Sequence, residues 1–121
     1  MAKLVVQCPS CAGELRVTKL ACASCGTHLD GQFEIPPLLR LSSEDLAFVT
    51  SFVKASGSLK EMAKLTGASY PTVRNRLDEI IGRVDEIERG VQKRRHEILD
   101  ALENGRLSAE AAEQELRKVG L

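Results

Sequence analysis

The sequence has few aromatic residues, no net charge and no long apolar run. Three Phe, one Tyr and no Trp among 121 residues provide few anchors for one large core, although 43% apolar residues exclude wholesale disorder. No stretch approaches the roughly 18 uninterrupted apolar residues of a membrane span, and the first residues lack the apolar core and cleavage site of a signal peptide. We therefore expect several small units in a cytoplasmic protein that does not bind a membrane.

The charges balance overall but are unevenly distributed. Seventeen basic residues oppose 17 acidic ones, which excludes a global attraction to nucleic acid. Residues 54–76 nevertheless hold five basic side chains and one acidic one, whereas residues 85–121 are slightly acidic. A polyanion is therefore expected to bind the middle of the chain.

The four cysteines form two Cys-x-x-Cys pairs that are separated by ten residues. Each pair can wrap a tight turn with both sulfurs directed at one metal ion, and two such turns supply a closed tetrahedral site. A closed site has no position for water, so the metal is expected to be structural Zn²⁺. The predicted metal ligands are Cys8, Cys11, Cys22 and Cys25.

Disulfides, a redox pair and an iron site are the other common uses of paired cysteines. Disulfides need an oxidising compartment, and a thioredoxin-like redox pair needs a single Cys-x-x-Cys at the start of a helix. Rubredoxin-like iron uses the same four thiolates and stays open, although Phe33 is the only aromatic residue nearby to shield a redox centre. His28 is expected to be a solvent-facing strand residue, since four thiolates already suffice.

Short apolar runs around the cysteines predict a small β zinc ribbon over residues 1–35. The predicted strands are Leu4–Val6, Leu15–Val17 with Leu20, and His28–Leu29 with Phe33. Pro36 and Pro37 then end the ribbon, because consecutive prolines cannot join a ladder or a helix interior.

Three helix starts follow within residues 38–84. Ser42–Asp45 has the serines and acids of a first turn, Ser58 and Glu61 have capping-box spacing, and Ser69–Pro71 begins a third helix. The second helix is short and closes at Gly67. A short helix, a glycine turn and a longer helix are typical of a helix-turn-helix.

The third helix is expected to be the reading helix of a DNA-binding domain. Arg and Asn contact base edges, hydroxyls bind phosphate, and lysines on the preceding helix add phosphate contacts. The predicted DNA-binding residues are Ser69, Tyr70, Thr72, Arg74, Asn75, Arg76, Lys60 and Lys64. A trihelical bundle with a merely solvated Arg-Asn-Arg face is the structural alternative.

Several of these motifs carry a family resemblance. Cys-Pro-x-Cys, a second Cys-x-x-Cys-Gly, Pro-Pro-Leu-Leu-Arg-Leu and Ser-Tyr-Pro-Thr-Val-Arg-Asn-Arg-Leu-Asp occur in this order. Residues 8 to about 84 thereby resemble a prokaryotic family that joins a four-cysteine zinc ribbon to a sigma-factor-like helix-turn-helix. The resemblance implies a DNA-binding transcriptional regulator with its DNA contacts in Ser69–Arg76.

Apolar residues continue at helical spacing beyond the third helix start. They are Leu77, Ile80, Val84, Ile87, Val91, Ile98 and Ala101, with Arg94 the single break. Gly82 and Gly90 predict a bend or break. Residues 85–121 are expected to form a helical hairpin that turns at Asn104–Gly105. From about Glu97 to Leu121 the sequence resembles a short C-terminal oligomerisation motif, which implies self-association as a homodimer or larger oligomer. Packing of the apolar stripe within one chain is the alternative.

The predicted fold is mainly α with a small β zinc ribbon: ribbon, trihelical helix-turn-helix and C-terminal helical hairpin. We expect no enzyme, because the sequence has no open metal position, no phosphate-binding glycine loop and no histidine-based triad. The leading hypothesis is a sequence-specific DNA-binding regulator. The alternative, which the zero net charge favours, is an adaptor that binds RNA polymerase, a sigma factor or another transcription component.

Overall fold

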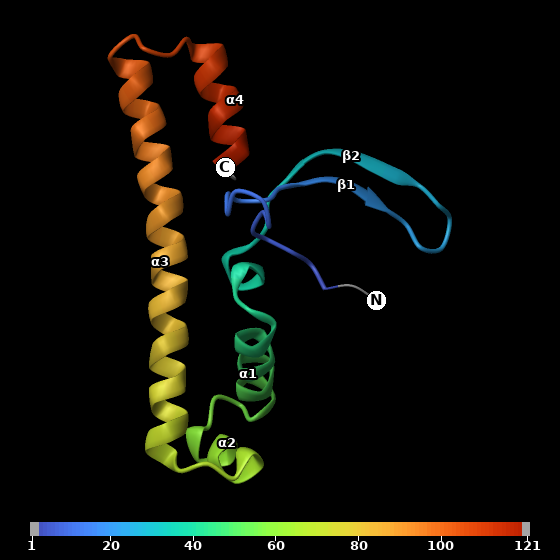
Figure 1. Cartoon of the computed structure of the whole chain (residues 1–121), viewed down its shortest axis with the longest axis vertical. Helices are drawn as coiled ribbons and strands as arrows, with labels where there is room; N and C mark the ends of the chain where they lie inside the picture. The colour runs from blue at the N-terminus through green and yellow to red at the C-terminus, as the bar shows by residue number, and fades with distance from the viewer. Residues whose placement is uncertain (1–2, 120–121) are drawn as a thin grey trace. The chain divides into compact units, whose positions relative to one another are not determined.

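The computed structural model describes residues 3–119, which form four α-helices, one 3-10 turn and two strands (Figure 1). The predicted fold class, mainly helical with a small sheet, is confirmed. Residues 1–2 of the predicted ribbon and 120–121 of the predicted hairpin lie outside the described residues. The chain divides into two compact units, one formed by the segments up to Pro36 and from Val91, the other by Pro37–Gly90.

The sheet of the first unit is a single antiparallel hairpin of β1 (Val17–Ala21) and β2 (His28–Phe33) (Figure 1). Leu20 lies opposite Leu29, and an irregularity between Val17 and Lys19 shifts the register. Both leucines remain exposed, at 46% and 55%. The hairpin therefore presents an uncovered apolar pair.

The predicted strand at Leu4–Val6 is wrong. The segment before β1 has only an isolated bridge between Gln7 and Glu14, together with a bond from the Leu15 N–H to the Val6 carbonyl at 3.0 Å. Because β1 and β2 pair with each other, Leu4 and Val5 extend no ladder and are more than half exposed. The second predicted strand is displaced, since β1 begins only at Val17.

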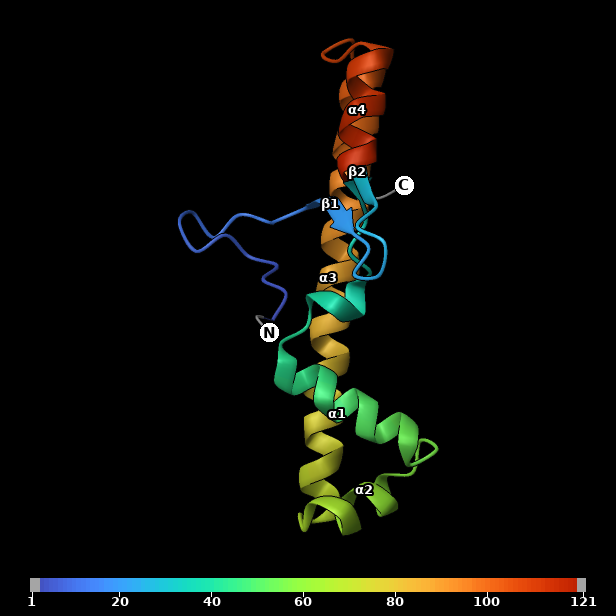
Figure 2. The ribbon, with the colours of Figure 1, turned by 90° about the vertical axis from the view of Figure 1, so that its right-hand side faces the viewer.

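A helical hairpin completes the first unit. The last turns of α3 (Tyr70–Glu103) lead through Gly105, whose φ of +71° suits glycine, into α4 (Ala109–Val119). The Ser108 hydroxyl accepts the Ala111 N–H at 3.1 Å and caps α4 as predicted. Both views show α4 beside the C-terminal part of α3 (Figures 1 and 2), and Ala112 is buried to 1% exposure.

The expectation of a bend or break in α3 is not met. The helix is continuous through Gly82 and Gly90. A glycine in a helix interior costs only about 1 kcal/mol relative to alanine, which the i to i−4 bonds of the other residues in a long helix can outweigh.

The second unit contains a 3-10 turn (Pro37–Arg40), α1 (Ser43–Lys54), α2 (Leu59–Thr66) and the first part of α3. Ser42 and Ser58 are N-caps, and their hydroxyls accept the N–H groups of Asp45 and Glu61, both at 3.1 Å. These two predicted helix starts are confirmed. In Figure 2, α1 crosses in front of α3.

The apolar core of the second unit is small. Its buried side chains come from the loop before α1 and from α2 and α3; they are Leu41, Met62, Val73 and Ile80. On α1, Phe48 and Phe52 stack with ring centroids 6.5 Å apart. Three large apolar residues of these helices are exposed: Val53 and Leu65, both 69%, and Ile81, 46%. Three helices leave no further element to cover these positions.

Candidate nucleic-acid interface and metal centre

The connection from α2 to α3 is the tight turn that a helix-turn-helix requires. Gly67 caps α2 in the left-handed conformation with φ +70°, and its N–H donates to the Ala63 carbonyl at 3.0 Å. The Ser69 hydroxyl accepts the Thr72 N–H at 3.3 Å and lies 2.8 Å from the Thr72 hydroxyl. α3 therefore starts at Tyr70, with Pro71 in the first turn, where no backbone N–H is needed.

The first two turns of α3 carry most of the predicted DNA-binding residues, and we call Ser69–Arg76 the reading segment. Five of the six predicted residues in it are exposed: Ser69, Tyr70, Thr72, Arg74 and Asn75. The opposite side of the helix packs into the core through Val73. The reading segment therefore presents hydroxyl, amide and guanidinium groups to solvent at a helix N-terminus.

Arg74 has an acidic neighbour that sequence reasoning did not include. Its Nη2 lies 3.2 Å from Oδ1 of Asp78, one turn further along the exposed side of α3, and each side chain is 52% exposed. A solvent-exposed pair at this spacing contributes only about 0.3–0.5 kcal/mol. A phosphate or a guanine edge can therefore displace Asp78 from Arg74.

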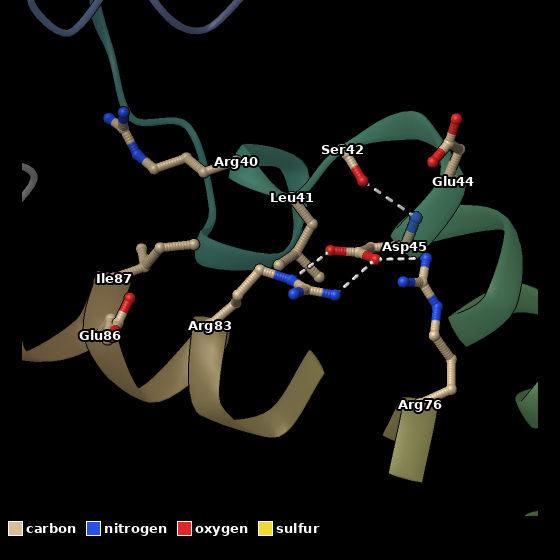
Figure 3. Close-up of a pocket in the computed structure, with 9 residues that line it drawn as sticks. All are labelled: Arg40, Leu41, Ser42, Glu44, Asp45, Arg76, Arg83, Glu86 and Ile87. Atoms are coloured by element: carbon tan, nitrogen blue, oxygen red, sulfur yellow. Dashed lines mark hydrogen bonds and ion pairs between the residues drawn. The ribbon is translucent and has the colours of Figure 1, made fainter. Parts of the chain in front are cut away.

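Arg76 is held differently, by a buried carboxylate. Asp45 in the first turn of α1 is 2% exposed, and its Oδ1 lies 2.7 Å from Arg76 Nη2 (Figure 3). Arg83 binds the same carboxylate through two bonds, Nε to Oδ2 at 2.6 Å and Nη2 to Oδ1 at 2.9 Å. These bonds raise the pKa of the Arg83 guanidinium above its ordinary value. Asp45 thus joins the start of α1 to two positions of α3 that are two helical turns apart.

An open groove of about 620 Å³ surrounds this cluster (Figure 3). Its lining is Arg40, Leu41, Ser42, Glu44, Asp45, Arg76, Arg83, Glu86 and Ile87. Three arginines and three acids make the lining electrically balanced, so the groove has no excess charge for an ionic ligand.

The lysines predicted to contact phosphates lie on α2. Lys60 and Lys64 are both exposed. Lys64 Nζ lies 3.4 Å from Glu61 Oε1, and both side chains are more than half exposed. This weak local pair leaves the ammonium accessible to a polyanion.

Asp45 and Arg83 are the partners that sequence reasoning missed. The sequence around Asp45 predicts only an acid in a helix first turn, where acids are common. A usable signal was present on α3, because Arg76 and Arg83 are seven residues apart and share a side with Val73 and Ile80. Two arginines at this spacing on a core-facing side of a helix predict a buried acid.

The two Cys-x-x-Cys segments fold into the same turn, and we call residues 8–13 the first knuckle and 22–27 the second. In the first knuckle, the Cys8 N–H donates to the Gly13 carbonyl at 2.8 Å, and the Ala12 N–H donates to the Cys8 carbonyl at 2.9 Å. In the second knuckle, the Cys22 N–H donates to the Thr27 carbonyl at 2.7 Å, and the Gly26 N–H donates to the Cys22 carbonyl at 3.0 Å. The residue after the second cysteine has a positive φ in both, +60° at Ala12 and +75° at Gly26.

Hydrogen bonds to sulfur favour the thiolate form, which binds metal. The N–H groups of Ser10 and Gly13 lie 3.4 Å from the Sγ atoms of Cys8 and Cys11, respectively. Backbone N–H groups of Cys11 and Ser10, followed by the Cys11 side chain, lower the pKa of Cys8. The Thr27 hydroxyl, 2.9 Å from Cys25 Sγ, is the largest of the contacts that lower the pKa of Cys25.

The structure pairs the cysteines within each knuckle but does not gather all four. Cys8 contacts Cys11, and Cys25 contacts Cys22. Among residues 3–119, no group of three or more His, Cys, Asp or Glu side chains is close enough to hold a metal ion. The donor set and the repeated turn fit a zinc ribbon, whereas a site built from all four thiolates stays a prediction. His28 is exposed on β2, as expected.

Two family models match consecutive segments of the chain. The model described as "DUF2089 zinc ribbon" matches residues 8–39, and "Domain of unknown function (DUF2089)-HTH" matches residues 41–86. Together the two matches cover well over half of the sequence. No curated protein and no solved structure matches the chain. None of the described helices is both long and apolar enough to span a bilayer.

Proposed function

Because this chain belongs to the DUF2089 family, with a zinc ribbon followed by a helix-turn-helix, we propose that it is a sequence-specific DNA-binding transcriptional regulator. It binds DNA without catalysing a reaction. The reading segment enters the major groove, and the zinc ribbon and C-terminal hairpin organise the rest of the molecule.

One observation carries this proposal: the exposed side chains at the start of α3 are of the types that contact DNA. Arg74 and Asn75 are exposed on its second turn, after a glycine-capped α2 and a serine-capped helix start. Helix N-terminal residues contact base edges in helix-turn-helix complexes, where Arg suits guanine and Asn suits adenine. Lys60 and Lys64 on α2 supply phosphate contacts.

Zinc has a structural role in this proposal. Cys8, Cys11, Cys22 and Cys25 hold Zn²⁺ through four thiolates, which leaves no open position on the metal. The equivalent backbone hydrogen bonds of the two knuckles support a pair of equivalent ligand turns. Metal analysis of the purified protein distinguishes zinc from the iron alternative, because an iron tetrathiolate is red and zinc is colourless.

The C-terminal hairpin supports self-association. Leu99 on α3 is 47% exposed, and an open groove of about 380 Å³ between α3 and α4 includes Ile98, Ala101, Leu107 and Val119 in its lining. A homodimer formed through these helices would present two reading segments related by two-fold symmetry. Its preferred DNA would then be a palindrome.

Selection of bound DNA from a random pool, with the zinc-loaded full chain, tests the proposal. We expect an enriched sequence whose affinity falls steeply with salt, because phosphate contacts release counterions. The Lys60→Gln/Lys64→Gln variant is expected to reduce the salt dependence while it keeps the sequence preference. No enrichment and no binding of genomic fragments at low salt would refute DNA binding.

The uncovered leucine pair on the β1–β2 hairpin favours a second function, that of an adaptor for RNA polymerase or a sigma factor. Leu20 and Leu29 lie opposite each other and are about half exposed, and apolar groups of this kind anchor protein interfaces. In this case Leu20→Ser/Leu29→Ser would abolish binding to purified polymerase or sigma factor, measured by calorimetry, with DNA affinity unchanged. Equal polymerase and sigma-factor binding by the variant and the parent would exclude this surface.

A further inference from the structure

We propose that the two arginines of the reading segment have different roles: Arg74 contacts DNA, whereas Arg76 is a positioning residue that holds the reading segment through Asp45. This inference rests on the proposed function and refines it. It also divides a set of residues that the sequence treats as equivalent, since both arginines flank Asn75 in one Arg-Asn-Arg run.

The position of Asp45 determines the role of Arg76. The Asp45 side chain is 3% exposed, so its carboxylate has almost no water and depends on protein partners. Arg76 supplies one of the three short contacts, at 2.7 Å, and Arg83 supplies the other two. Removing one partner from a buried charge leaves that charge poorly compensated. Arg76 therefore cannot turn toward DNA without weakening the attachment of α1 to α3.

The two arginines also lie on different sides of α3. Arg76 follows Val73 by three residues and precedes Ile80 by four, so it lies on the core-facing side of α3, and its side chain is only 35% exposed. Arg74 lies on the other side, with 52% of its side chain exposed. Of the two, Arg74 is the arginine that a groove of DNA can reach.

The acidic partners of the two arginines also differ in exposure. Asp78, the partner of Arg74, is itself 52% exposed and returns to water when DNA displaces it. Asp45 is buried, so its carboxylate cannot return to water when Arg76 leaves it. The exposed pair is therefore exchangeable and the buried pair is not. Arg76 contributes to DNA recognition by fixing where Arg74 and Asn75 point.

Matched Arg→Gln variants test this division. Each removes one charge but keeps the aliphatic part of the side chain and a polar end group. For Arg74→Gln we expect unchanged thermal stability, about tenfold weaker binding of the selected DNA, and a salt slope reduced by about one. For Arg76→Gln we expect a lower melting temperature, an unchanged salt slope, and a several-fold lower ratio of selected to scrambled DNA affinity.

The ratio of selected to scrambled DNA affinity distinguishes a positioning role of Arg76 from a purely structural one. If folded Arg76→Gln binds both DNAs like the parent, the positioning role is refuted. If it loses one unit of salt slope at an unchanged melting temperature, Arg76 is a phosphate contact and the division is also refuted. If Arg74→Gln retains the full affinity and salt slope, the role assigned to Arg74 fails.

Arg83→Gln provides a second, independent test. Arg83 binds the same carboxylate but lies seven residues beyond Arg76. We expect Arg83→Gln to lower the melting temperature and the ratio of selected to scrambled DNA affinity, as Arg76→Gln does. It replaces Arg76→Gln as the test if that variant is too unstable to study. An unchanged melting temperature of Arg83→Gln would contradict the proposal that these arginines hold Asp45. If the parent protein binds no DNA, the proposed function fails. Melting temperatures and an Asp45→Asn/Arg76→Gln double-mutant cycle still report whether Arg76 holds Asp45.

Discussion

The guanidinium of Arg94 binds the carboxylate of Glu14 through two parallel contacts, Nη1 to Oε2 at 2.6 Å and Nη2 to Oε1 at 2.8 Å. Glu14 directly follows the first knuckle, and Arg94 lies on α3 within the same unit. Arg94 is also the single break in the apolar spacing of that helix. The break is therefore explained by a partner that is 80 residues away in the sequence.

A double-mutant cycle with Glu14→Gln and Arg94→Gln measures this pair. Both side chains are about half exposed, and Arg94 Nε is buried without a hydrogen-bond partner among residues 3–119. We expect a coupling of about 0.5–1 kcal/mol in the free energy of unfolding, since exposed pairs contribute little but a bidentate geometry favours them. Urea denaturation of the zinc-loaded protein gives this value.

The Glu113–Arg117 pair on α4 serves as the control. It spans one helical turn, and both of its side chains are more than 60% exposed. Its coupling is expected to be about 0.3–0.5 kcal/mol. A Glu14–Arg94 coupling no larger than this would show that the contact does not attach the first knuckle to α3.

The second prediction concerns the core of the helix-turn-helix. Met62 and Leu65 are large apolar residues of the same short helix, but Met62 is 1% exposed and Leu65 is 69% exposed. Met62→Ala is expected to lower the free energy of unfolding by about 2–5 kcal/mol, because it leaves a cavity at a fully buried position. Leu65→Ala is expected to change it by less than about 0.5 kcal/mol.

Denaturant midpoints of the two variants check this assignment directly. A comparable loss for Leu65→Ala would show that its exposed side is covered in solution, for instance by a second copy of the chain. Concentration dependence of its midpoint would then identify self-association as the cause.

The sequence predicted the features that depend on neighbouring residues. Ser42 and Ser58 cap helices as predicted because a cap needs only the N–H groups of the following turn. Gly67 adopts the left-handed conformation expected of a glycine at a helix end. The same local rules predicted the order of the helices, whereas the strand at Leu4–Val6 is wrong, the next strand begins only at Val17, and α3 has no break.

Features that depend on distant residues were not predicted. Nothing near Asp45 in the sequence indicates that Arg76 and Arg83 surround it, and an acid in a helix first turn needs no partner. Val53 and Leu65 are exposed although they are large apolar residues of helices, because periodicity identifies a helix side but not whether another element covers it. The DNA-binding residues therefore stay a prediction, to which the structure adds the contacts of Arg76 and Arg83 with Asp45.

The third prediction uses the repeated geometry of the two knuckles. Ala12 and Gly26 hold equivalent positions, both with positive φ, but only glycine adopts that conformation without steric cost. Ala12→Gly is expected to tighten zinc binding and Gly26→Ala to weaken it, each by about 1 kcal/mol or roughly fivefold. No atom lies within 4 Å of a Cβ added at Gly26, so the effect there is purely conformational.

Competition with a chromogenic chelator measures both zinc affinities. Ser24→Ala is the control, since it changes an exposed side chain of the second knuckle at a residue without a positive φ. Its zinc affinity should equal that of the parent. Opposite shifts for Ala12→Gly and Gly26→Ala would mean that both knuckles bind the metal in the conformation described here. A shift for only one of them would mean that a single cysteine pair binds zinc, which would refute the four-thiolate site.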